Sequence, residues 1–228
     1  PQDTSSAASD VYKRQERFYG DESVLTRVVK AMPRLQSLEA EMENDTKLLF
    51  KLKMPELKRL RLDQNHDYAF QVLAKNKSLA RLESISFLPH AVYPGDEPYI
   101  QLSDLEHLCR SKNLKSLKSL NLTSAEFGDD GIQEIVKSGL IERLEELVLE
   151  HGCVTDEGAA TLAGADLSGL KRLVLDYNFL TKAGIDTLKK SGVKFSAKDQ
   201  YTGDPSENTE YLYLSLIHIS EPTRPQCI

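Results

Sequence analysis

The sequence predicts an α/β solenoid, with a parallel sheet of short strands on a concave face and helices on the convex face. Two observations lead to this prediction. A leucine motif recurs along the chain, and in three of its copies a glycine and an apolar residue follow at fixed distances. A unit of one strand, one turn and one helix cannot bury its apolar face alone, so successive units must stack.

The motif LxxLxL marks the predicted strands. Four copies are complete, at residues 57–62, 117–122, 144–149 and 170–175, and two looser copies stand at 35–40 and 82–87. Successive copies begin 22, 25, 35, 27 and 26 residues apart, and every step except 35 fits one strand-and-helix unit. The alternation in LxL buries one side of a short strand. We therefore expect about six to seven repeats.

Predicted helices follow the last three strands. A glycine lies nine residues after the final leucine, and an apolar residue on the same helical face follows four residues later, in the pairs Gly131–Ile135, Gly158–Leu162 and Gly184–Leu188. We expect the acidic residues Asp129, Asp130, Asp156 and Glu157 to satisfy free amide groups and the helix dipole at these helix starts. We expect each glycine to let the helix backbone approach the strand, because an anion-binding loop would need clustered glycines.

These repeats resemble the leucine-rich repeat family, in particular the longer-repeat class typified by ribonuclease inhibitor. The resemblance covers about residues 22–195 and implies a horseshoe whose strands line the concave face. The string VKFSAKDQYTGDPSENTEYLY is similar to the acidic, tyrosine-ending terminus of a bacterial subfamily of unassigned function. We therefore expect a polar acidic tail from residue 196.

The chain departs from the family pattern in two places. The asparagine that often follows the strand is present as Asn65 and Asn178, but Ala125 and Gly152 replace it in two copies, with Cys153 one place late. We expect an irregular ladder there. The 35-residue step contains an insertion at 89–101, where three prolines and a glycine predict a loop.

Both ends of the chain lie outside the predicted repeat domain. The string DVYKRQ at 10–15, written as GAT GTG TAT AAG AGA CAG, has the reverse complement CTG TCT CTT ATA CAC ATC, which encodes the string LSLIHI found at 214–219. The longer segments 5–15 and 214–224 resemble translated transposase sequencing adapters. We interpret 1–15 and 214–228 as non-native adapter-derived segments and 16–213 as an N-terminally truncated repeat domain. The alternative, a polar surface segment and a buried strand, leaves this relation between two DNA strands unexplained.

Composition limits the partners and the compartment. The chain has a net charge of −6, and the two flanks remove three acidic and three basic residues, which leaves that value unchanged. An acidic protein is a poor candidate for binding nucleic acid or anionic membranes. Cys109 and Cys153 form no disulfide framework and no zinc pattern, so we expect a cytoplasmic protein without a metal or cofactor. No apolar run reaches membrane-spanning length.

The resemblance implies that residues between and just after the motif leucines point outward from the concave face, and in this chain they form three rows. The first is Ser37, Arg59, Ser84, Ser119, Glu146 and Arg172; the second is Glu39, Arg61, Ser86, Asn121, Val148 and Val174; the third is Glu41, Asp63, Leu88, Thr123, Glu150 and Asp176. We expect Glu39 to meet Arg61, and Glu146 to meet Arg172, because neighbouring strands lie about 4.8 Å apart.

The third row suggests a binding site. It places Glu41 beside Asp63 and Glu150 beside Asp176, with no basic residue among its six members. Like charges opposite each other destabilise a sheet, so we expect these pairs to receive a basic partner. The alternative is that nearby lysines or solvent screen them. The partner-binding candidates are Glu41, Asp63, Arg59, Arg61, Tyr93, Tyr99, Glu146, Glu150, Arg172, Asp176 and Tyr177.

Two tyrosines of the insertion, Tyr93 and Tyr99, are candidates as interface anchors, although they can equally fold the loop onto the sheet. A catalytic reading of His151, Cys153 and Glu150 is less favoured than a structural cysteine. His66 is a turn residue without a ligand set, and Cys109 belongs to the core.

The favoured function is a non-enzymatic module that binds a protein or peptide through its concave face and rim. The alternative is an accessory domain of a larger enzyme or biosynthetic system. Catalysis by the repeats themselves is the least favoured reading.

Overall fold

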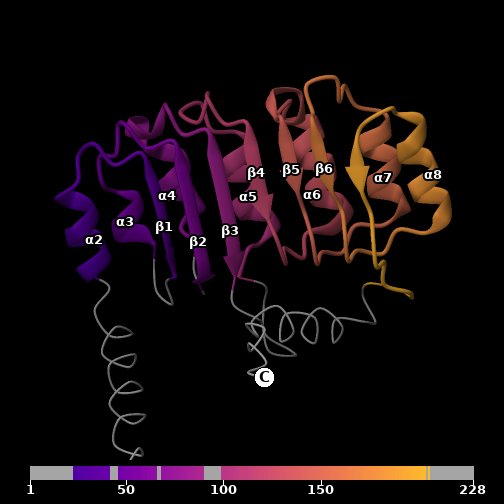
Figure 1. The fold of residues 1–228 in the computed structure, drawn as a ribbon, viewed down its shortest axis with the longest axis horizontal. Coiled ribbons are helices and arrows are strands. Elements are labelled where there is room, and N and C mark those ends of the chain that lie inside the picture. The colour runs from indigo at the N-terminus through magenta and orange to yellow at the C-terminus, as the bar shows by residue number, and fades with distance from the viewer. Residues whose placement is uncertain (1–22, 42–45, 66–67, 90–98, 204, 206–228) are drawn as a thin grey trace, which may run out of the picture.

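The computed structural model describes residues 23–41, 46–65, 68–89, 99–203 and 205. These residues form seven parallel strands in chain order, with helices behind one face of the sheet (Figure 1). The strands are β1 (Ser37–Glu41), β2 (Arg59–Asn65), β3 (Ser84–Pro89), β4 (Ser119–Leu122), β5 (Glu146–Val148), β6 (Arg172–Val174) and β7 (Phe195–Ser196). The helices are α2 (Ser23–Lys30), α3 (Lys47–Phe50), α4 (Phe70–Lys75), α5 (Leu102–Cys109), α6 (Gly128–Lys137), α7 (Asp156–Ala163) and α8 (Lys182–Lys190), with 3-10 turns η1 (Lys77–Leu79) and η2 (Ile141–Arg143). The predicted α/β solenoid is confirmed.

Several predicted features fall outside the described residues. They are the two interpreted adapter segments, 1–15 and 214–228, together with His66, Tyr93 and most of the 89–101 insertion.

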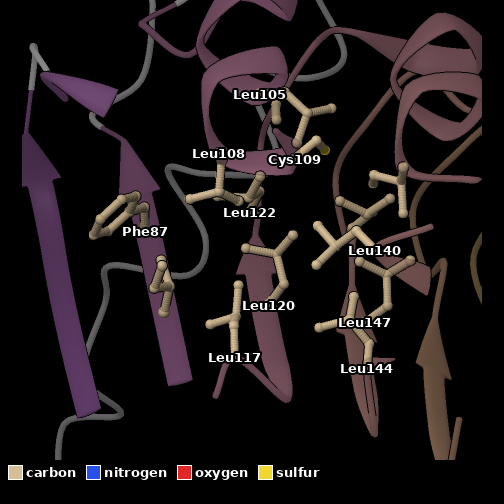
Figure 2. Packing of buried hydrophobic residues seen from close by; sticks show 14 of the residues in the cluster. Phe87, Leu105, Leu108, Cys109, Leu117, Leu120, Leu122, Leu140, Leu144 and Leu147 are labelled. Carbon is tan, nitrogen blue, oxygen red and sulfur yellow. The ribbon is translucent and has the colours of Figure 1, made fainter. Parts of the chain in front are cut away.

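The motif leucines form the core between the sheet and the helices. Leu117, Leu120 and Leu122 are buried, and Figure 2 shows them in one cluster with Leu105 and Leu108 of α5. The predicted core position of Cys109 is also confirmed, since it is only 4% exposed. Full burial of a leucine stabilises the fold by about 1.5–3 kcal/mol, so the repeated leucines contribute strongly to the packing of the helices on the sheet.

Aromatic rings replace a leucine in the looser copy at 82–87. Phe87 takes the last motif position, and its ring stacks on Tyr68 with centroids 4.6 Å apart and meets the edge of Phe70 at 5.3 Å. The Tyr68 hydroxyl donates a hydrogen bond of 3.1 Å to the Leu62 carbonyl, so its polar end is satisfied. These larger side chains fill the core where the leucine pattern weakens.

The helix starts agree with the prediction in part: the four acidic residues lie in the first turns of α6 and α7, but they do not cap these helices. Asp129 does not cap its own helix: its carboxylate accepts the backbone N–H of Thr155 at 2.8 Å and the Thr155 hydroxyl at 2.6 Å, in the next repeat. Asp156 binds Thr181 in the same way, at 2.8 and 2.5 Å. The threonine hydroxyls themselves accept the first-turn amides of α7 and α8. Since threonine provides the cap, the aspartate is left to tie adjacent repeats together.

The helix glycines also have a different role from the predicted one. A Cβ atom at Gly158 would lie 2.3 Å from Asp129 Oδ1, and one at Gly184 would lie 2.1 Å from Asp156 Oδ1. At Gly131 the nearest atom is Cδ2 of Phe127, at 1.9 Å. These glycines therefore make room for a side chain, whereas we expected close approach to a strand.

A side-chain ladder follows the last strands. Asn178 donates to the Leu149 carbonyl at 2.7 Å and accepts the Val154 amide at 2.9 Å. Gln200 repeats this arrangement with Leu175 and Leu180, at 2.8 and 2.9 Å. No such side chain exists at Ala125 or Gly152, where we expected irregularity, although backbone hydrogen bonds continue past these strands. Gly152 leaves space for Asn178, because a Cβ there would lie 2.8 Å from the Asn178 Oδ1 atom.

A seventh strand lies at the position where we expected the acidic tail to begin. Phe195 and Ser196 form β7, which pairs with β6, and Gln200 continues the ladder on the last repeat. The strand lacks the LxxLxL motif, so its sequence gave no leucine signal for a seventh copy.

Candidate functional site: the concave face

The three outward rows follow the predicted register. Ser37 lies opposite Arg59, Arg59 opposite Ser84, Ser84 opposite Ser119, Ser119 opposite Glu146 and Glu146 opposite Arg172. The second row aligns in the same way, and beyond the strand ends the His151 amide donates to the Asp176 carbonyl at 3.1 Å. The strands therefore present their outward side chains side by side on one face.

At the β1–β2 end, one arginine serves two carboxylates. The predicted contact of Glu39 with Arg61 is confirmed at 3.5 Å. Arg61 also holds Asp63 at 2.8 Å, because residues two apart in a strand share a face. The expectation that Asp63 belongs to an uncompensated acidic pair is therefore wrong. In contrast, Arg59 forms no ion pair within the described chain and only a long 3.4 Å hydrogen bond to Ser37 Oγ.

At the β5–β6 end, the charged residues of the first row compensate each other. Glu146 pairs with Arg172, as predicted, and accepts a 2.7 Å hydrogen bond from the Ser119 hydroxyl. The Ser119 hydrogen bond, together with Arg172, lowers the pKa of the Glu146 carboxyl despite partial burial. The second row contributes little here, because Val148 and Val174 are only 4% and 3% exposed.

The third row keeps two carboxylates without a partner among the described residues: Glu41, which is exposed opposite Asp63, and Glu150. Asp176 accepts the Ser196 hydroxyl at 2.6 Å and the Lys198 amide at 2.7 Å. Glu150, half-buried beside it, has neither a hydrogen bond to its carboxylate nor an ion pair among the described residues. Partial burial, and then the charge of Asp176, raises the pKa of the Glu150 carboxyl. The ionised form of Glu150 is therefore less stable in the folded protein than it would be in water.

The seventh strand adds a basic residue to the third row. The pairing of Val174 with Ser196 brings Lys198 opposite Asp176, so the row does contain a basic residue beyond its predicted six members. The Lys198 side chain makes no ion pair in the described part of the chain, and only its backbone amide binds Asp176. Glu150 stays without a cation in contact.

Aromatic side chains adjoin this end of the row. The His151 and Tyr177 rings stack nearly parallel, with centroids 4.3 Å apart, and His151 Nδ1 lies 3.2 Å from the Tyr201 hydroxyl. Burial lowers the pKa of His151. Tyr177 was a sequence candidate, whereas Tyr201 and the stacking were missed. The 26-residue spacing of His151 and Tyr177, equal to the repeat step, was the available signal.

Left-handed backbone recurs at this edge of the sheet. The φ angles of Ser124, His151, Tyr177 and Asp199 are 60°, 52°, 55° and 50°, one such residue after each of four successive strands. Such a conformation costs a non-glycine residue roughly 1–2 kcal/mol. The recurrence explains how His151 and Tyr177 come to project side by side.

The remaining candidates do not gather into a reactive site. Burial, followed by the charges of Glu126 and Asp129, raises the pKa of the Cys153 thiol to about 12, which supports a structural cysteine. Tyr99 is half-buried, apart from the rows.

The described residues contain no group of three or more potential metal ligands. None of their helices is both long and apolar enough to span a bilayer.

Comparisons with known proteins agree with this architecture. The family model described as Leucine Rich repeat matches residues 113–136 and 144–163. A solved protein from Bacteroides fragilis superimposes with a TM-score of 0.51 at 20% identity, over 69% of this chain and 52% of the other, a likeness of fold alone. The chain thus spans about half the length of that protein. No curated protein sequence matches. The matched segments and the parallel solenoid that contains them show that this chain carries leucine-rich repeats.

Proposed function

We propose that this protein is a non-enzymatic interaction module that binds a protein or peptide through its concave face and rim. Leucine-rich repeats are generally protein-interaction modules, and solenoid curvature provides an extended concave surface for this purpose. The proposal extends that general role to a specific face of this chain.

The observation that carries the proposal is the state of Glu150. Its carboxylate is half-buried, lies beside Asp176, and has neither a hydrogen bond nor an ion pair within the described chain. Every other acidic side chain of the β5–β6 rows has a partner: Glu146 has Ser119 and Arg172, and Asp176 has Ser196 and Lys198. A basic side chain from a partner would compensate this one remaining charge.

The net charge supports the same class of partner. A chain with a net charge of −6 attracts basic proteins and peptides and repels nucleic acid. The Tyr177 ring next to Asp176 adds an aromatic surface of the kind found at interface anchors.

Selection from a displayed random-peptide library tests the proposal. We expect enriched peptides to contain Arg or Lys, and Glu150→Lys to weaken their binding by about tenfold, as loss and reversal of one interface charge does. The matched control is Glu142→Lys, which changes an exposed residue of η2 and alters the net charge equally. Equal binding by the two variants, or enrichment of acidic peptides, would contradict the proposal.

A further inference from the structure

Two unpaired charges of opposite sign lie on the concave face, one on β2 and one just beyond β5. Arg59 on β2 is exposed and has no ion pair in the described chain, whereas the other arginine of that strand, Arg61, is held by Glu39 and Asp63. Glu150, just beyond β5, has no hydrogen bond to its carboxylate and no ion pair in the described chain. Arg59 and Glu150 are therefore an unpaired cation and an unpaired anion on the same side of the sheet, and the other unpaired charges of the rows, Glu41 and Lys198, lie on the strands outside this pair.

Between these two charges the face is neutral. The outward residues of β3 and of the β4 strand and its end are Ser84, Ser86, Leu88, Ser119, Asn121 and Thr123. The hydroxyls of Ser84 and Ser86 have no hydrogen-bond partner among the described residues, and both side chains are half-buried. Small polar side chains of this kind leave room for a peptide backbone and can donate to its carbonyl groups.

The register fixes the separation of the two charges. From Arg59 to Glu146 there are three strand-to-strand steps, and Glu150 lies four residues further along its chain. With strands about 4.8 Å apart and about 3.3 Å per residue, the two positions lie roughly 20 Å apart on a diagonal. Six residues of extended chain cover about this distance, whereas a helix would need about 13 residues.

We infer that the partner is a dipolar extended segment, with an acidic side chain that pairs with Arg59 and a basic side chain, about six residues away, that pairs with Glu150. This inference rests on the proposed function and adds the charge pattern of the ligand. Charge complementarity selects it over a purely basic peptide, which would leave Arg59 unpaired or repel it.

Three synthetic nine-residue peptides with blocked ends test the inference. Two carry Glu and Arg six positions apart, in opposite orders, separated by Ser and Ala; the third replaces Glu by Gln. Fluorescence anisotropy with the full chain measures their affinities. We expect one dipolar order to bind about fivefold more tightly than the Gln peptide, the effect of one further exposed ion pair.

Two variants test whether Arg59 and Glu150 cause the tighter binding of the dipolar peptide. Arg59→Gln is expected to remove the fivefold difference and to leave the Gln peptide unaffected, whereas Glu150→Gln weakens all three peptides. Lys171→Gln, which removes a cation from another exposed position, is the charge control.

The outcomes separate this inference from the proposed function. Equal affinity of the dipolar and Gln peptides overturns the dipolar partner but leaves a basic partner at Glu150 in place. A gain that survives Arg59→Gln also overturns it. Failure of all three peptides to bind overturns an extended dipolar ligand, while the display selection still decides whether the face binds any peptide.

Discussion

The carboxylate of Asp129 occupies the space that a side chain at Gly158 would need. A Cβ atom there would lie 2.3 Å from Asp129 Oδ1 and 2.8 Å from Val154 Cγ1. The glycine of one repeat is therefore required by an aspartate of the repeat before it.

Substitution of Gly158 by Ala is expected to destabilise the protein by about 2–4 kcal/mol. The new methyl group displaces Asp129 from Thr155 and disrupts two hydrogen bonds to a charged acceptor. Urea denaturation measures the change in the free energy of unfolding. In the Asp129→Ala background the same substitution should cost much less, since the colliding carboxylate is gone.

Gly164→Ala is the matched control for Gly158→Ala. Its φ angle is −85°, and a Cβ atom there would meet only carbonyl oxygens at 3.6 Å. We expect a neutral effect or a gain of about 0.5 kcal/mol, from the lower entropy of the unfolded chain. Equal losses at positions 158 and 164 would show that helix glycines, rather than the Asp129 contact, determine the result.

Asn178→Ala is expected to cost about 2–4 kcal/mol and Gln200→Ala about 1–2 kcal/mol. Both remove a side chain that satisfies a backbone amide and a carbonyl of its neighbouring repeat, but Asn178 is fully buried and Gln200 is half-buried. Thermal and urea denaturation give the two values. A larger loss at Gln200 would contradict the view that burial sets the cost.

Glu150→Gln is expected to stabilise the protein at neutral pH, by less than about 1 kcal/mol because the side chain is partly solvated. A carboxyl whose pKa is raised by folding adds stability when protonated, and that contribution is lost as the pH rises through the raised pKa. The gain over the wild type should therefore shrink on acidification towards about pH 4. Unfolding curves over this pH range, with Glu142→Gln as control, measure it; a gain that grows on acidification would refute it.

Cys109 and Cys153 are expected to resist thiol reagents in the folded protein. Burial raises the pKa of Cys109 to about 11 and that of Cys153 to about 12, so roughly one thiol in a thousand and one in ten thousand is ionised at pH 8. In a Cys227→Ser background, a colorimetric thiol assay should detect two thiols only after urea is added. Rapid modification of Cys153 before unfolding would restore the catalytic reading of this residue.

Deletion of residues 1–15 and 214–228 is expected to change the melting temperature by less than about 2 °C. The reason is the codon relation between DVYKRQ and LSLIHI, which links the two segments through DNA and not through folding. Differential scanning calorimetry of the full and shortened chains gives the comparison. A large loss of stability would contradict the interpretation of these segments as adapter-derived.

Strand periodicity explains what could be predicted. Because alternate residues share a face, the spacing of the motif leucines predicts that Arg59, Ser119 and Glu146 lie in one row, and the register agrees. The pairing of Glu39 with Arg61 followed from the same reasoning.

Interactions that depend on side-chain reach could not be predicted in this way. Arg61 turns along its own strand to Asp63, and Asp129 reaches across to Thr155, neither of which follows from spacing alone. The seventh strand was not predicted, because Phe195 and Ser196 carry no leucine motif. The roles of Lys198 and Gln200, which follow this strand, were missed for the same reason.

The links from Asp129 to Thr155 and from Asp156 to Thr181 all point the same way along the chain, from one repeat to the next. Opening of α6 releases the threonine that caps α7, and opening of α7 does the same for α8. Loss of structure should accordingly spread more readily towards the C-terminal repeats than back from them, a polarity of unfolding built into a nearest-neighbour array. Amide hydrogen exchange at Thr155 and Thr181 would follow the opening of the preceding helix.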